Sequence, residues 1–212
     1  MKIKKFDSGI LHSCMYVVEE SGHAIIIDPC KNTTPAADLI VDYLIITHEH
    51  YDHISGVNDW KNITRSPLMC SKSCAENIKD PKKNMSRYFE AFCAMQTWMP
   101  SDQIEVETTE YSCEADEVFE DETVLEWQGH TVTLCEIPGH SEGSIGIDID
   151  STDFFSGDSL MRDYEIELRF PGGSARVWEN FGRKRVDAIP DGTMIWPGHF
   201  ENYIMHKHIV SK

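Results

Sequence analysis

The sequence contains no long hydrophobic run and few basic residues. No apolar run approaches the roughly 18 residues that a membrane-spanning helix needs, so no membrane interaction is expected. The 19 lysines and arginines stand against 36 aspartates and glutamates, which gives a formal net charge of −17. Because an acidic surface repels phosphate backbones, a nucleic-acid partner is not expected either. The expected partner is a small-molecule substrate.

A disulfide framework is also missing. The seven cysteines, an odd number, lie at positions 14, 30, 70, 74, 93, 113 and 135, without the spacing of a stapled secreted domain. The chain shows no charged and then apolar leader. We therefore predict a cytoplasmic protein with reduced thiols. Cys70 and Cys74 would make half of a zinc site, but no second pair completes it, and packing as small hydrophobes is favoured.

Strands and helices are mixed in both halves of the chain, which is expected to form one domain over residues 1–212. Short apolar runs predict strands at 2–6, 14–18, 24–27, 43–47, 67–71, 124–128, 132–137, 144–149, 154–156 and 193–196. Helices are predicted from about residue 34, and over 53–60, 86–97 and 174–189. Between 73 and 120 the pattern is otherwise loose. Periodicity alone thus indicates a mixed α and β domain.

The residues with the clearest chemistry are 48–53 (His-Glu-His-Tyr-Asp-His), which we call the histidine loop. They follow Tyr43–Thr47, a short apolar run that predicts a buried strand. His48 and His50 alternate by two and so face one side of an extended segment, whereas Asp52 and His53 follow where the chain turns. So many titratable groups at the end of a buried strand need a counter-ion, and imidazoles with carboxylates suit zinc or iron.

Three further candidate ligands, His140, Asp158 and His199, also follow apolar runs. Each comes directly after a glycine, which lets the backbone approach a site closely or adopt a positive φ. One such unit is weak evidence, but four ligand segments in one chain predict a metal site. His12 is interpreted either as support for a ligand ring or as a surface histidine.

The set His48, His50, Asp52, His53, His140, Asp158 and His199, in this order, resembles the metallo-β-lactamase-fold hydrolases. The sequence looks most like the short form of glyoxalase II (hydroxyacylglutathione hydrolase). The supporting features are Asp158, Phe-Pro-Gly-Gly at 170–173, and Pro-Asp-Gly-Thr at 190–193 before Pro-Gly-His at 197–199. This resemblance covers nearly the whole chain. It implies an α+β fold, an αβ/βα four-layer sandwich of two mixed β-sheets flanked by helices.

The resemblance also implies a dinuclear metal site. The first ion would be held by His48, His50 and His140, the second by Asp52, His53 and His199, with Asp158 bridging them. The expected cofactors are two divalent ions, zinc first, with iron or manganese as alternatives. The implied activity is hydrolysis of a small thioester or ester by attack of a metal-bridging hydroxide on its carbonyl. Asp52 would be the catalytic residue that orients the nucleophile or takes its proton.

Other functions fit parts of the same sequence. The resemblance extends to persulfide dioxygenases of this fold, mononuclear-iron oxidoreductases that would use His48, His140 and Asp158. Gly-Asp-Ser-Leu at 157–160 matches the GDSL esterase signature, but it lies far from the N-terminus and lacks a C-terminal Asp-x-x-His partner. Ser159 is therefore expected to be a bystander. A structural zinc site is disfavoured because such sites are closed sets of four ligands.

Several features bear on the substrate without identifying it. Full-length glyoxalase II enzymes bind glutathione through a C-terminal helical domain, and the sequence ends 13 residues after His199, so a glutathione thioester is not expected. Met161 lies where lactonases of the superfamily have tyrosine, three residues after the bridging aspartate, which argues against a lactone substrate. Tyr164 would substitute for that tyrosine, but its spacing from Asp158 is wrong. Arg169 would meet an anionic substrate or form a surface salt bridge. The aromatic residues of 86–97 would line a substrate entrance or, as is favoured, form the buried face of a helix.

Overall fold

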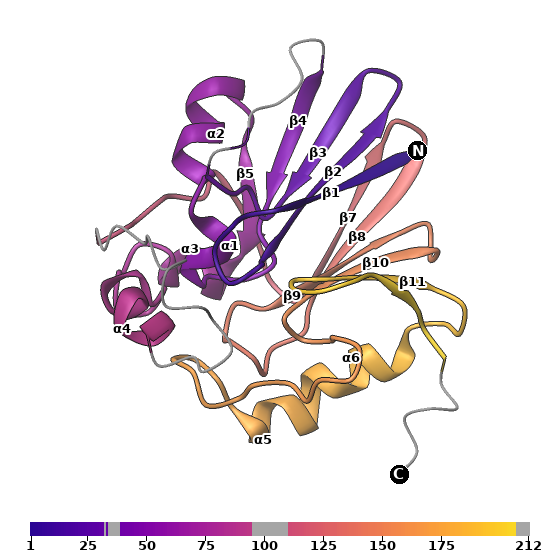
Figure 1. Ribbon diagram of the computed structural model, residues 1–212. Helices are drawn as coiled ribbons and strands as arrows, with labels where there is room; N and C mark the ends of the chain where they lie inside the picture. The colour runs from indigo at the N-terminus through magenta and orange to yellow at the C-terminus, as the bar shows by residue number, and fades with distance from the viewer. Residues whose placement is uncertain (32, 34–38, 95–109, 207–212) are drawn as a thin grey trace.

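Two β-sheets of six strands each lie at the centre of the structure, with helices on their outer sides (Figure 1). The structure is a computed structural model, and it describes residues 1–31, 33, 39–94 and 110–206. The N-terminal half of the chain forms the first sheet and the C-terminal half forms the second. The sandwich of two mixed sheets flanked by helices, which the resemblance implied, is thereby confirmed.

The first sheet has the strand order β1-β2-β3-β4-β5-β6. Its strands are β1 (Lys2–Asp7), β2 (Cys14–Glu20), β3 (His23–Ile27), β4 (Ile40–Ile45), β5 (Leu68–Ser71) and β6 (Glu117–Phe119). β1, β2 and β3 pair antiparallel, and β3 to β6 run parallel. The carboxyl ends of β3, β4 and β5 therefore meet at one edge of the sheet.

The second sheet has the order β12-β11-β10-β9-β8-β7. Its strands are β7 (Glu122–Trp127), β8 (His130–Glu136), β9 (Ile145–Ile149), β10 (Asp153–Gly157), β11 (Met194–Pro197) and β12 (Tyr203–Ile204). β7 to β10 form an antiparallel meander, and β10 pairs parallel with β11. β8, β10 and β11 consequently run in one direction, and their carboxyl ends share an edge.

Alternation along the central strands builds the buried layers. In β3, Ala24 and Ile26 pack with Trp60 in the cluster between the first sheet and its helices. Ile25 and Ile27 pack with Phe155 in the cluster between the two sheets. Successive side chains of a strand point to opposite faces, so a strand that is apolar at every position is covered on both sides. A third cluster lies between the second sheet and its helices.

The helices follow the two halves of the chain (Figure 1). α1 (Tyr51–Ile54), α2 (Val57–Thr64), α3 (Lys72–Asn77) and α4 (Phe89–Ala94, preceded by a 3₁₀ turn at Ser86–Tyr88) belong to the first half. α5 (Ala175–Val177), a π-helical segment (Trp178–Gly182) and α6 (Arg183–Ala188) cover the second sheet as the continuous helical segment predicted at 174–189. Within the described ranges, no helix is both long and apolar enough to cross a bilayer.

Sequence-based boundaries differ from the structure in a few places. The strand predicted at 43–47 runs from Ile40 to Ile45, because the backbone N–H of Thr47 donates to the side chain of Asp28 instead of to a neighbouring strand. The single helix predicted at 53–60 was wrong, since α1 and α2 are separate elements. α3, β6 and β12 were missed because such short elements carry little periodicity. The predicted helix start near residue 34 and residues 95–97 lie outside the described residues.

Candidate metal centre

Four candidate ligands lie in the histidine loop, which follows β4 and continues into helix α1 at Tyr51. Their side chains, those of His48, His50, Asp52 and His53, are all buried. Burying so many polar groups is costly unless each finds a partner. The histidine loop is therefore a place where the fold concentrates donor atoms.

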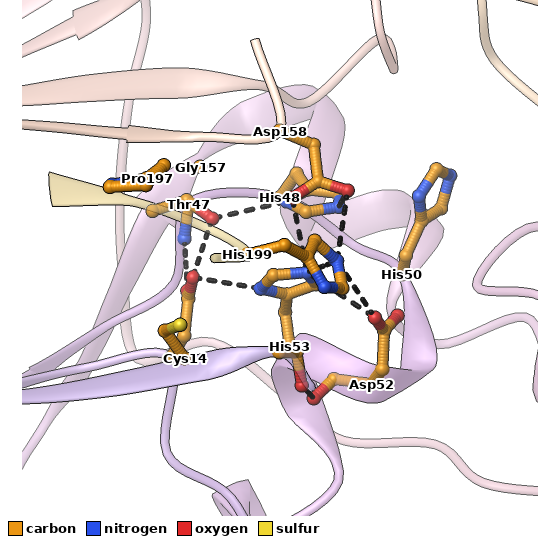
Figure 2. Close-up of polar contacts among 12 residues, drawn as sticks. Cys14, Thr47, His48, His50, Asp52, His53, Gly157, Asp158, Pro197 and His199 are labelled. Atoms are coloured by element: carbon orange, nitrogen blue, oxygen red, sulfur yellow. Dashed lines mark hydrogen bonds and ion pairs between the residues drawn. The ribbon is translucent and has the colours of Figure 1, made fainter. Parts of the chain in front are cut away.

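The other three candidates come from the carboxyl ends of the second sheet. His140 follows β8, Asp158 follows β10 and His199 follows β11. Figure 2 shows Asp158 and His199 facing the side chains of the histidine loop. The structure thus brings together all seven residues that the sequence singled out, from two sheets and four separate segments.

The donor atoms form three overlapping groups, in each of which they lie within 4.8 Å of one another. The groups are His48 with His50 and His140; His48 with His53 and Asp158; and Asp52 with His53 and His199. Nδ1 of His50 lies 3.0 Å from Nε2 of His140. The carboxylate of Asp158 reaches the remaining groups, with Oδ2 3.5 Å from Nε2 of His140 and 3.4 Å from Nε2 of His199. Oδ2 of Asp158 therefore lies within 4.0 Å of an imidazole nitrogen from each of the three groups.

Glycines allow the second-sheet segments to approach this closely. A Cβ at Gly198 would lie 2.1 Å from Oδ1 of Asp158, and one at Gly157 would lie 2.7 Å from Oγ1 of Thr47. Gly157 also has a φ of +49°, a backbone conformation that residues other than glycine adopt less readily. The sequence signal of a glycine before each candidate ligand thus has a steric cause at Asp158 and at His199.

A second contact fixes the orientation of four of the five imidazoles. Nδ1 of His48 lies 3.0 Å from Oγ1 of Thr47, and Nδ1 of His53 lies 3.0 Å from Oδ2 of Asp28. Nδ1 of His140 and of His199 contact backbone carbonyl oxygens, at 2.8 and 3.0 Å respectively. Each of these rings therefore turns Nε2 toward the centre, an arrangement typical of metal-ligating histidines.

Asp28 is a supporting residue that the sequence reading missed. It is buried at the end of β3 with a positive φ of 53°. Its carboxylate accepts hydrogen bonds from the backbone N–H and the hydroxyl of Thr47, both at 2.7 Å, besides facing His53. One side chain thus holds both ends of the histidine loop. Its only sequence signal was an acidic residue directly after a buried strand.

Glu49, inside the histidine loop, was missed as well. It is only 1% exposed, and its carboxylate accepts from Nδ2 of Asn77 at 2.8 Å and from Oγ of Ser141 at 2.7 Å. Ser141 directly follows the candidate ligand His140. Glu49 therefore ties the ligand segment of the first sheet to that of the second.

Burial and charge divide the candidate ligands by protonation. Burial lowers the pKa of His48 and His50, and it lowers that of His140 to about 4, so these imidazoles are neutral at pH 7. Burial alone would raise the pKa of Asp158, but the neighbouring charges of His199 and His53 hold it well below its usual range. Asp158 is consequently an ionised carboxylate between the neutral His140 and the two histidines whose pKa values the nearby carboxylates raise, His53 and His199.

Several buried donor atoms have no protein partner. Nε2 of His48, Nε2 of His50 and Oδ1 of Asp158 are buried without a hydrogen-bond partner among the described residues. Unsatisfied buried polar atoms are rare and cost free energy. A coordinated cation would satisfy His48 and Asp158, and imidazoles with carboxylates are the donors that divalent zinc and iron accept. The residues present therefore fit a metal centre.

A cavity of about 490 Å³ opens over these donors. His50, Asp52, His140, Asp158 and His199 line its floor. The remaining described lining residues are Leu11, Met85, Phe89, Phe92, Met161, Tyr164, Glu165, Glu167, Phe170 and Phe200. A small molecule in this cavity would therefore lie directly against the candidate metal centre.

The helix at 86–94 serves both roles that the sequence left open. Phe89 is buried in a cluster with Leu11 and Tyr51, and it also lines the cavity together with Phe92. Tyr88 is exposed. The buried face of the helix is thus one wall of the cavity, so the two interpretations are not alternatives. Residue 95, also named in that prediction, lies outside the described residues.

Four other residues that the sequence offered as possible site residues have surface or packing roles in the structure. Arg169 is 88% exposed and pairs with Glu167 as a surface salt bridge. His12 is exposed and contacts Asp7 rather than a ligand ring. Cys70 and Cys74 pack in the apolar core between the first sheet and its helices. Each of these residues is accounted for without a role in the metal centre.

The segment that follows Asp158 contains three further residues considered from the sequence, Ser159, Met161 and Tyr164. Ser159 is buried with its hydroxyl unpartnered, next to Asp158. Tyr164 stacks on Phe200 and lines the cavity together with Met161. The spacing from Asp158 therefore did not prevent Tyr164 from reaching the site.

Comparison with known proteins matches the sequence profile of the Metallo-beta-lactamase superfamily to residues 9–199. The hydroxyacylglutathione hydrolase of Wigglesworthia glossinidia brevipalpis is 25% identical over 175 residues, which cover 80% of this chain and 49% of that protein. The hydroxyacylglutathione hydrolase of Prochlorococcus marinus (strain MIT 9211) is 24% identical over 204 residues, covering 87% of this chain and 64% of that one. The chain thus spans from about half to just under two thirds of the length of these relatives.

Solved structures share the fold. The BLEG-1 B3 metallo-beta-lactamase superposes with a TM-score of 0.75 at 21% identity, covering 96% of this chain and 94% of that one. ETHE1 from Myxococcus xanthus superposes with a TM-score of 0.67 at 18% identity, covering 95% of this chain and 76% of that one. At these identities the likeness establishes the architecture and no more.

Proposed function

The chain belongs to the metallo-β-lactamase superfamily, and we propose that it is a dinuclear metal-dependent hydrolase of small thioesters or esters, with zinc as the expected metal. The observation that carries the proposal is the gathering of seven buried donor residues in three overlapping groups beneath one cavity. A single tetrahedral ion uses at most four such donors. The names of the similar hydroxyacylglutathione hydrolases support the reaction class.

The chain's residues divide into binding, orienting and proton-handling roles. His48, His50 and His140 would hold one ion and Asp52, His53 and His199 the other, with Asp158 shared. Bound divalent ions would supply Lewis acidity toward a carbonyl oxygen and lower the pKa of water toward neutrality. The buried cavity floor excludes bulk water from the reacting carbonyl, which strengthens the electrostatic interactions there.

Asp52 is the residue that we propose takes the proton from the attacking water. It lines the cavity, and its Oδ2 lies 3.4 Å from Nε2 of both His53 and His199. Burial alone would raise the pKa of Asp52, but the charge of His53 and the hydrogen bond with His199 lower it. A carboxylate held ionised at the cavity floor can accept a proton there.

A second candidate is a mononuclear-iron dioxygenase, which would use His48, His140 and Asp158. Oδ2 of Asp158 lies 4.0 Å from Nε2 of His48 and 3.5 Å from Nε2 of His140, so two histidines and one aspartate also converge. The structural likeness to ETHE1 from Myxococcus xanthus supports the same architecture. This reading leaves Asp52, His53 and His199 without a metal-binding role, and the hydrolase is therefore favoured.

Metal analysis and a substrate panel separate the two functions. The protein is purified without added metal, its bound metals are counted, and thioesters, esters and lactones are assayed alongside oxygen consumption with a persulfide. We expect two zinc ions per chain and thioester or ester hydrolysis that a chelator abolishes and zinc restores. One iron per chain with oxygen consumption would overturn the hydrolase and support the dioxygenase.

A further inference from the structure

The cavity over the metal centre is apolar on both sides of the donors. Phe170 lies 5.9 Å from His50 and 6.0 Å from His140 between ring centroids, and its ring meets Phe92 edge-on at 5.1 Å. On the other side, Tyr164 and Phe200 stack with centroids 4.4 Å apart and planes inclined by 7°. Aromatic surface therefore flanks the position where a substrate carbonyl would lie.

The charged residues of the cavity above its floor are acidic. Glu165 and Glu167 line it, and none of its described lining residues is lysine or arginine. A carboxylate on a bound substrate would therefore meet two carboxylates and no described cationic partner in the lining.

Arg169, which directly precedes the lining residue Phe170, is already paired. Its Nε and Nη2 donate to the carboxylate of Glu167 at 2.8 and 2.6 Å, and its side chain is 88% exposed. To meet a substrate anion, Arg169 would have to give up this two-pronged pairing, which is the strongest geometry for arginine and carboxylate. While Arg169 is paired in this way it balances the charge of Glu167, so it does not also serve a negative substrate.

From these observations we propose that the site selects uncharged substrates, thioesters or esters that carry an alkyl or aromatic group, and rejects anionic thioesters such as those of glutathione. This inference rests on the proposed function and narrows its substrate class. Burial of an apolar group against the aromatic walls provides the favourable term. Juxtaposition with Glu165 and Glu167 provides the unfavourable one for an anion, in a protein that already carries a net charge of −17.

Binding of two non-hydrolysable thioethers tests the selectivity apart from catalysis. S-octyl-N-acetylcysteamine and S-octylglutathione carry the same apolar group, and only the second carries carboxylates. Titration calorimetry on the metal-loaded protein should give at least about tenfold tighter binding of the uncharged thioether, a difference of about 1.4 kcal/mol. Equal affinities, tighter binding of S-octylglutathione, or no binding of either compound would overturn the proposal.

Hydrolysis of the matching octanoyl thioesters then tests the proposed hydrolase function separately from the proposed selectivity. Turnover of the N-acetylcysteamine thioester in preference to the glutathione thioester supports both the function and the selectivity. If neither thioester is hydrolysed while the thioether preference persists, the proposed function fails and the selectivity stands. If both are hydrolysed equally well, the function stands and the selectivity fails.

Substitutions in the cavity lining test separately the contributions of the acidic residues and of the aromatic walls to the selectivity. Glu165→Gln with Glu167→Gln should reduce the preference for the uncharged thioether several-fold, because it removes both charges and releases Arg169. Glu114→Gln, an exposed acidic residue outside the lining, is the matched control and should leave the preference unchanged. Tyr164→Ser, at an exposed position, should weaken binding of both octyl compounds alike. An unchanged preference in the double variant would overturn the electrostatic part of the proposal.

Discussion

The two halves of the molecule orient their ligand rings in different ways. In the histidine loop, side chains hold the rings: the hydroxyl of Thr47 faces His48, and the carboxylate of Asp28 faces His53. In the second half, backbone carbonyls do so: that of Glu167 faces His140, and that of Leu11 faces His199. A side-chain contact can be removed by one substitution, whereas a backbone carbonyl stays whatever residue carries it.

This difference separates two kinds of constraint on the candidate metal centre. The contacts in the first half depend on which side chains stand at positions 28 and 47. The second-half contacts depend on where the chain runs between β10 and α5 and after β1. Sensitivity of metal binding to substitution at the supporting residues should therefore be concentrated in the first half.

Removing the carboxylate of Asp158 should have the largest effect, because this residue follows β10 in the second half and contacts candidate ligand rings from both halves. In Asp158→Asn the side chain keeps its size but loses the charge that faces His53, His140 and His199. We expect metal affinity and hydrolysis to fall by more than the roughly 100-fold upper range seen for supporting residues. Competition with a chelator measures the affinity. Asp163→Asn, an exposed position on the same segment, is the control, and an Asp158→Asn protein with full metal content would contradict a shared role.

Asp28→Asn should have the next largest effect. The amide would present a donor where Thr47 and His53 also donate, so at least one of the three hydrogen bonds is lost. We expect a loss of about 10- to 100-fold in metal affinity, concentrated on the ion held by His53. Asp42→Asn, which alters a carboxylate bonded to His23 and Trp127 away from the site, should leave metal affinity unchanged. Equal effects of the two substitutions would show that Asp28 acts only through stability.

Glu49→Gln tests the link between the halves. A glutamine can accept from Asn77 or Ser141, but its amide group then faces the other donor. We expect the free energy of unfolding of the metal-free protein to fall by about 1–3 kcal/mol. Each kcal/mol corresponds to roughly 2–4 °C in melting temperature for a domain of this size, which calorimetry resolves. Glu142→Gln, which has only a 3.4 Å contact with Asn77, is the control. No change in melting temperature would mean that the two ligand segments are independent.

The same contrast explains how much of the site could be predicted. The candidate ligands were visible because polar residues interrupt apolar strands and because glycine precedes three of them. Thr47 and Asp28 were in principle visible, since their side chains carry the contact, but no periodicity marks a carboxylate that acts 25 residues away from His53. The carbonyls of Leu11 and Glu167 were invisible, because every residue has one.

For the fold, the buried strands could be predicted and the short edge elements could not. β3 has apolar residues on both faces, and β9 alternates Ile145, Ile147 and Ile149 with Gly146 and Asp148, so both sequences predict strands. β6 has three residues and β12 has two, which are too few to show an alternation of apolar and polar residues. The sequence predicted the buried face of the helix at 86–97 but not that this face lines the cavity. Phe89 belongs both to a buried cluster and to the cavity wall, and sequence patterns do not distinguish these two roles.

Thr47→Val should produce the smallest measurable change and gives the sharpest test of the contrast. Valine keeps the branched shape of threonine but removes the hydroxyl, which faces Nδ1 of His48 and also donates to Oδ2 of Asp28. Asp28 retains its bonds to the backbone N–H of residue 47 and to His53. Of the two hydrogen bonds lost, only the one to His48 holds a candidate ligand directly, and one neutral hydrogen bond is worth about 1 kcal/mol, which corresponds to roughly fivefold in metal affinity. Thr47→Ser should restore it. Glu167→Gln, at the residue whose backbone oxygen holds His140, should leave affinity unchanged, and a larger loss there than in Thr47→Val would contradict the division between side-chain and backbone support.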